Sequence, residues 1–115
     1  MRYLMLIYWN ETVDHDMTDE EREGQFTAYR AFTQEVMDRE IFCAADALQS
    51  VATATTVRVR NDQTLLTNGP FAETKEHLGG FYMVDCETVE EVIELAAKIP
   101  HAQKGSIEIR PIMEY

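Results

Sequence analysis

The stretch from Asn68 to Phe81 holds the densest group of side chains that could do chemistry. Five polar residues follow one another there, from Glu73 to His77. A glutamate can act as a general acid or base, and a neighbouring lysine can hold an anionic group or lower the carboxylate's pKa. Asn-Gly-Pro at 68–70 and Gly-Gly at 79–80 flank the cluster and restrict or bend the backbone. This arrangement is typical of a positioned site, and equally of a tight loop between two strands.

The first hypothesis is therefore a pocket for a small organic ligand between the sheet and this loop, near the interface of the dimer that is predicted below. Glu73 and Glu76 are the candidate catalytic acid and base, and we expect no redox cofactor. Phe71 and Tyr82 offer apolar walls. The predicted ligand-binding residues are Tyr8, Phe71, Thr74, Lys75, His77 and Tyr82. In the alternative interpretation, the carboxylates and the lysine are solvated and pair weakly at the surface.

Two other groups of residues are weaker candidates for chemistry. The segment from Glu11 to Asp16 combines carboxylates with His15, and such a set can bind a divalent metal. Its spacing matches no established metal motif, so we expect a solvated loop and no metal site. His101 follows a predicted helix and can titrate near neutral pH, but the helix dipole alone favours a histidine there.

The pattern of apolar residues predicts the elements that must position these side chains. We expect strands at 2–9, 41–48, 80–86 and 106–113, and a hairpin over 55–67 near the edge of the main sheet. Thr18 with Glu21, and Thr88 with Glu91, predict capping boxes at the starts of two helices, which run to about Glu40 and to Pro100. We expect loops at 10–17 and 101–105.

This order of elements predicts an α+β fold, a ferredoxin-like βαββαβ sandwich with an inserted β-hairpin. Two helices can cover only one face of such a sheet. The strands at 2–9 and 80–86 are nevertheless apolar on both faces, and an exposed apolar face attracts another chain. We therefore expect a homodimer in which two sheets pack face to face.

The sequence Asn-Gly-Pro-Phe-Ala-Glu-Thr-Lys-Glu at 68–76 resembles the signature of the DGPF-domain proteins, part of the YCII-related family, with Asn68 in place of the usual Asp. The resemblance extends to 54–60, to Leu-Gly-Gly-Phe-Tyr at 78–82 and to Glu-Ile-Arg-Pro at 108–111, and so covers almost the whole chain. It implies a small ferredoxin-like protein that dimerises as an α/β barrel, in a family whose activities are mostly unassigned.

The resemblance also bears on function. The wider YCII group is similar to proteins for which a His–Asp pair serves as acid and base, with the histidine on the first helix. This sequence has no histidine between Thr18 and Glu40, so the resemblance does not assign a His–Asp pair to this chain. DGPF proteins are also linked to extracytoplasmic-function sigma factors, which makes an accessory module that binds such a protein partner the second hypothesis. The third is that the signature only shapes the dimer.

Composition limits the classes of function further. The 115 residues predict a single domain spanning 1–115. A net charge of −11 disfavours direct binding to nucleic acid and to anionic membranes. Residues 1–9 are too short to span a bilayer and lack the features of a signal peptide, so we expect a cytoplasmic protein. Cys43 and Cys86 predict two buried thiols.

Overall fold

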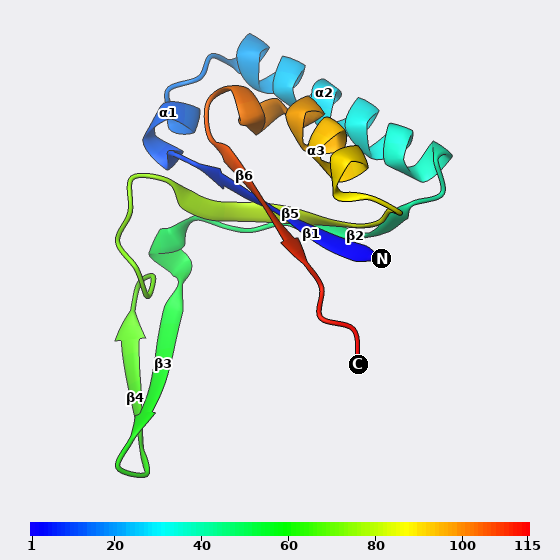
Figure 1. Cartoon of the computed structure of the whole chain (residues 1–115). Coiled ribbons are helices and arrows are strands. Elements are labelled where there is room, and N and C mark those ends of the chain that lie inside the picture. Colours follow the sequence, from blue (N-terminus) through cyan, green and yellow to red (C-terminus); the bar gives the residue numbers. More distant parts are fainter.

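The chain folds as a four-stranded antiparallel sheet with its two long helices on one face (Figure 1). The computed structural model describes residues 1–115. The strand order in the sheet is β2-β5-β1-β6. The main elements are β1 (Arg2–Trp9), α2 (Asp19–Asp38), β2 (Phe42–Ala47), β5 (His77–Asp85), α3 (Val89–Lys98) and β6 (Ser106–Pro111). The predicted α+β, ferredoxin-like class is confirmed.

Three short helical segments lie where the sequence predicts loops or connections. They are α1 (Glu11–His15), η1 (Val51–Thr53) and η2 (Pro100–Gln103). Asn10 begins α1, because its side chain accepts a hydrogen bond from the backbone N–H of Thr12. Pro100 both ends α3 and begins η2, since a proline suits the first turn of a helix. The predictions of plain loops at 10–17 and 101–105 were therefore wrong.

β5 begins three residues earlier than expected. His77 and Leu78 pair with Trp9 and Tyr8 of β1, across a bulge in the register of these two strands. Both glycines at 79–80 thus lie inside the strand, whereas the sequence predicts that the strand begins at Gly80. Cross-strand pairing overrides the low strand preference of glycine here.

The helices bury narrower stripes than their patterns predict. Thr18 makes the expected capping box with Glu21, and Thr88 accepts a hydrogen bond from the backbone N–H of Glu91. In α2 only Phe32 and Val36 are buried, and both lie in the C-terminal half of the helix. Helical spacing predicts that Phe26 and Met37 of α2 and Val89 and Ile93 of α3 belong to buried stripes, but all four are exposed.

The core lies between the helices and the adjacent face of the sheet. Met5 of β1, Val84 of β5 and Leu95 of α3 have no exposed surface. Cys86 joins this core, as expected. Cys43 is exposed, so that part of the prediction was wrong. The opposite face of the sheet carries half-buried apolar side chains with no second layer over them, namely Leu4, Leu6, Tyr8, Phe81 and Met83.

The predicted hairpin forms a separate two-stranded sheet of β3 (Thr55–Arg60) and β4 (Gln63–Asn68). We call residues 55–68 the arm. The expectation that it lies near the edge of the main sheet was wrong, because no strand of that sheet pairs with it. Figure 1 shows the arm projecting from the sheet on the side opposite the helices. The signature loop, residues 69–76, connects the arm to β5.

No helix of the chain is both long and apolar enough to cross a lipid bilayer.

Candidate acid–base site

A pocket of about 530 Å³ lies between α2 and the sheet. Its walls are largely apolar and aromatic. It is lined by Ile7 and Trp9 of β1, Gln25, Phe26, Tyr29 and Thr33 of α2, Phe42, Ala45, Asp46 and Ala47 of β2, Gly79, Gly80, Phe81 and Tyr82 of β5, and by Asp14 and His101. An apolar cavity of this size with a few convergent polar groups is typical of a small-molecule site.

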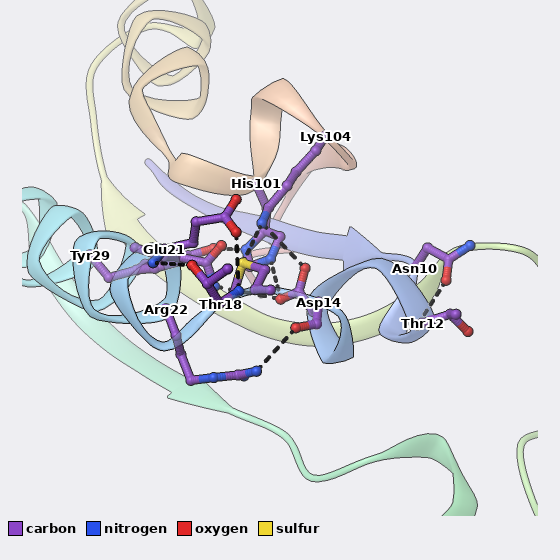
Figure 2. Close-up of polar contacts among 11 residues, drawn as sticks. Asn10, Thr12, Asp14, Thr18, Glu21, Arg22, Tyr29, His101 and Lys104 are labelled. Carbon is purple, nitrogen blue, oxygen red and sulfur yellow. Dashed lines mark hydrogen bonds and ion pairs between the residues drawn. The ribbon is translucent and has the colours of Figure 1, made fainter.

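Three polar side chains of this pocket form a connected chain of hydrogen bonds centred on His101. His101 Nε2 lies 2.8 Å from Asp14 Oδ2, and His101 Nδ1 lies 2.5 Å from the Tyr29 hydroxyl. Because a carboxylate can only accept, Nε2 carries the hydrogen and donates to Asp14. Nδ1 of the neutral ring then accepts from the Tyr29 O–H. We call Asp14, His101 and Tyr29 the relay; Figure 2 shows how its members converge.

Three elements far apart in the sequence supply the relay. The short helix α1 presents Asp14, the middle of α2 presents Tyr29, and η2 presents His101. Gly105 lets η2 lie close to β1, because a Cβ at this position would overlap the carbonyl oxygen of Tyr8. Local chain geometry at Asn10, Pro100 and Gly105 thus brings the three side chains together.

Trp9 packs against His101 and fixes the plane of its ring. The two rings are stacked, with centroids 4.2 Å apart and planes inclined by 18°. The indole also lies against Gly79, where a Cβ would overlap three atoms of the ring. The Leu-Gly-Gly-Phe segment therefore supports the site indirectly. Its first glycine leaves the space that Trp9 needs to stack on His101.

Burial and charge set the protonation states of the relay. Burial lowers the pKa of His101, which is only 1% exposed, although the Asp14 carboxylate partly opposes this shift. Burial alone would raise the pKa of Asp14, but the hydrogen bond from His101 and the nearby Lys104 charge hold it below its usual value. Burial raises the pKa of the Tyr29 hydroxyl. At neutral pH the relay is thus carboxylate, neutral imidazole and phenol.

Lys104 and Arg22 surround the Asp14 end of the relay. The Lys104 ammonium lies 3.5 Å from Asp14 Oδ1, and the Arg22 guanidinium donates to the Asp14 carbonyl oxygen at 3.4 Å (Figure 2). Asp14 Oδ1 is buried and makes no hydrogen bond. The carboxylate is therefore held by His101 on one oxygen and faces a cation across a longer distance on the other.

The structure does not bring together the residues that the sequence singles out. Tyr82 lines the pocket, and its hydroxyl lies 2.6 Å from Thr33 Oγ1. Tyr8 lies on the opposite face of the sheet, where its hydroxyl donates to Glu108 at 3.3 Å. His77 lies beside Trp9 in the neighbouring strand, outside the pocket, with a buried Nδ1 that has no hydrogen-bond partner.

The other predicted residues lie in the signature loop, away from the pocket. Glu73, Thr74 and Lys75 are exposed. Thr74 donates to the carbonyl oxygen of Glu76, and the Glu76 carboxylate accepts from Ser106 at 2.7 Å. Phe71 is 74% exposed. Their roles in ligand binding and catalysis stay predictions, but these side chains line no part of the pocket beside His101.

Sequence reasoning considered Asp14 and His101 separately and did not pair them. They are 87 positions apart, and no spacing rule connects them. Tyr29 was expected only as part of an apolar stripe. The sequence offered two weak signals of the site. His101 directly follows Ile-Pro, and Asp14 lies in a short polar segment, but neither pattern identifies the partner of the other residue. The expectation of a plain solvated loop around Asp14 was wrong, because that carboxylate is hydrogen-bonded to a buried histidine.

Comparison with known proteins gives two consistent matches. The family model of the YCII-related domain matches residues 1–115. An uncharacterized protein of Rhizobium meliloti (strain 1021) is 32% identical over 117 residues, an alignment that covers 100% of this chain and 94% of that protein. Neither match names a ligand or a reaction.

Gly79→Ala tests the support of the site by Trp9. The new methyl group overlaps the indole, so we expect Trp9 to leave its stack on His101 and the protein to lose about 1–3 kcal/mol of stability. Trp9 is the single tryptophan, so its fluorescence and near-ultraviolet circular dichroism report the change directly. Gly24→Ala in α2 is the matched control, because a Cβ there meets nothing within 4 Å. Native-like stability and tryptophan spectra in Gly79→Ala would contradict this account.

The buried relay makes stability depend on pH. The folded His101 resists protonation, whereas in the unfolded chain it takes up a proton near its ordinary pKa of about 6.5. Below that pH the unfolded state binds more protons, so the free energy of unfolding decreases as the pH falls. Urea denaturation at a series of pH values measures this slope. His101→Gln should lack this component, and an equal slope in both proteins would show that His101 is not its source.

Proposed function

We propose that this chain, which belongs to the YCII-related family, binds a small organic molecule beside His101 and catalyses proton transfer on it. The observation that carries the proposal is the relay, an aspartate–histidine–tyrosine chain with bonds of 2.8 and 2.5 Å at the wall of an apolar pocket. A buried histidine held between a carboxylate and a hydroxyl is an arrangement that suits general acid–base catalysis.

Tyr29 is the member of the relay that meets the ligand first. It is half-buried at the pocket wall, whereas His101 lies behind it, almost fully buried. A proton leaving the ligand passes to the Tyr29 oxygen as Tyr29 gives its own proton to His101 Nδ1. The Asp14 carboxylate then stabilises the imidazolium that forms. Return of the proton along the same path to another atom of the ligand completes the reaction and restores the neutral relay.

The lining of the pocket indicates which molecules it accepts. None of its residues is a lysine or an arginine, and it includes two aspartates, Asp14 and Asp46. An anionic ligand would lose its hydration and find no cation in the lining, within a chain of net charge −11. The aromatic walls formed by Trp9, Phe26 and Tyr82 favour a flat ring. We therefore infer an uncharged or cationic ligand with an unsaturated or aromatic group.

The homodimer remains part of the proposal. The sheet face opposite the helices carries Leu4, Leu6 and Met83 with nothing over them, and a second copy packed face to face would bury this surface. In such a dimer the helices lie outermost. The pocket, which is on the helix side of the sheet, would then remain open to solvent in each copy.

Exposed apolar residues on the arm favour an interaction role in addition to ligand binding. Gly69 at the start of the signature loop donates to the Ala54 carbonyl oxygen at 2.7 Å, and Thr56 donates to the Gly69 carbonyl oxygen at 2.9 Å. These bonds support the hypothesis that the signature shapes an interface. A partner linked to extracytoplasmic-function sigma factors stays a prediction, supported only by family resemblance.

Deuterium exchange tests the catalytic proposal. The native protein is incubated in D₂O with a mixture of uncharged aldehydes and ketones, and mass spectrometry measures deuterium on carbon. We expect incorporation with the native protein and a loss of roughly 100-fold or more in His101→Gln, because the proton acceptor is removed.

His15→Gln is the control, because this exposed histidine lies next to Asp14 but outside the relay. Equal incorporation by the two variants would overturn the role of His101. No incorporation above the protein-free reaction would overturn proton transfer on this class of ligand.

Benzamide, benzamidine and benzoate test the class of ligand, because they share one ring and differ in charge. The indole N–H of the single tryptophan gives one resolved NMR signal at the pocket wall. We expect benzamide and benzamidine to shift this signal and benzoate to leave it unchanged, since the lining has no cation. A benzoate affinity equal to that of benzamide would contradict the electrostatic argument.

A further inference from the structure

The arm is a two-stranded ribbon that receives no support from the main sheet. β3 and β4 pair only with each other, from Thr55 opposite Asn68 to Arg60 opposite Gln63. Asn61 and Asp62 close the turn with φ of 51° and 63°, the backbone that suits a two-residue hairpin turn. A hairpin of this kind is marginally stable in water unless another surface packs on it. The arm therefore has the form of an element completed by a partner.

One face of the arm is apolar and open. Val57 lies directly opposite Leu66, and Val59 follows on the same face. Val57 is 58% exposed and Leu66 is 68% exposed. Val57 is flanked along β3 by Thr56 and Arg58, which point to the other face. Leu66 is flanked by Thr67 and by Leu65, which lies opposite Arg58 on that other face. Adjacent exposed side chains of this size are typical of an interaction surface.

The other face of the arm is cationic. Arg58 and Arg60 alternate with the valines, and the Arg58 guanidinium lies 5.0 Å from the centroid of the exposed Phe71 ring. With Asp62, the two arginines give the arm a net charge of +1. Since the chain carries −11, its remaining residues carry −12. The arm is thus a positive projection on a strongly acidic protein.

We propose that the arm of one copy packs along the body of a second copy of this chain. Charge favours this occupant, because the arm brings two arginines to a body of net charge −12. Geometry favours it too, because the arm projects from the same side of the sheet as the uncovered face (Figure 1). The inference rests on the homodimer of the proposed function and adds the contact that the arm makes within it.

The length of the arm fits this position. Six residues in each strand span about 20 Å, whereas two sheets packed face to face lie about 10 Å apart. An arm that starts at one sheet therefore passes the plane of the other and lies along the flank of the partner. There the apolar face with Val57 and Leu66 meets protein, and Phe71 lies at the base of the contact. The Gly-Pro-Phe part of the signature, which lines no part of the pocket, would then support this contact between copies.

Sedimentation velocity on four proteins tests the proposal. The arm variant Val57→Thr/Val59→Thr/Leu66→Thr keeps residues suited to strands and removes only apolar surface. Leu6→Thr alters the uncovered sheet face. Ile93→Thr is the matched control, because Ile93 lies in the helix layer and its exposure, 53%, is similar to the 58% of Val57. Because a two-fold interface carries each substitution twice, we expect the arm variant to weaken dimerisation on the order of 100-fold. Ile93→Thr should match the native protein.

The outcomes separate the two proposals. A dimer weakened by Leu6→Thr but not by the arm variant would overturn the arm contact and leave the face-to-face dimer standing. A native protein that stays monomeric at micromolar concentration would overturn both. Circular dichroism checks that each variant is folded.

A photoreactive phenylalanine at position 66, in a mixture of isotopically light and heavy chains, provides a second measurement. Cross-links between light and heavy chains support the contact. Cross-links only within one chain, together with an unchanged dimer, overturn it.

Discussion

The stack of Trp9 on His101 is the contact on which the rest of the candidate site depends. It holds a histidine in the protein interior in one orientation, so that both ring nitrogens find partners in Asp14 and Tyr29. A buried imidazole without those partners would be costly. The stack in turn requires Gly79, which gives the indole a flat surface in the neighbouring strand. Five elements of the fold therefore meet around one aromatic contact.

The relay resembles in chemistry, but not in position, the His–Asp pair that the family resemblance implies. That pair would place its histidine on the first long helix, where this chain has none. Here the histidine comes from the turn after α3, and the aspartate from a five-residue helix before α2. The first long helix supplies Tyr29 instead. The proposed site thus combines a histidine and an aspartate from elements other than those that the resemblance implies, since function depends on the site and not on the order of elements in the chain.

The two faces of the sheet have separate tasks in this interpretation. The helix side holds the core, the pocket and the relay, with Tyr82 shared between the core and the pocket wall. The opposite side carries apolar residues and the arm, which suit contacts with a second copy. The segment from Asn68 to Phe81 connects the two sides. Its Gly-Pro-Phe part lies at the base of the arm, and its Gly-Gly part lies in β5 beneath Trp9.

The sequence alone determined the elements with strong local signals and, through them, the fold. Thr18 with Glu21 marked the start of α2, and Pro100 marked the end of α3. A short apolar run marked β1, and alternation marked β3 of the arm, because caps, prolines and such patterns act over a few residues. Only the tertiary structure decided the site. Asp14, Tyr29 and His101 carry no shared local pattern, and the signature drew attention to Glu73 and Lys75, which the fold leaves exposed. Hydrogen bonds between distant residues form where packing brings them together, and that packing is a property of the whole chain.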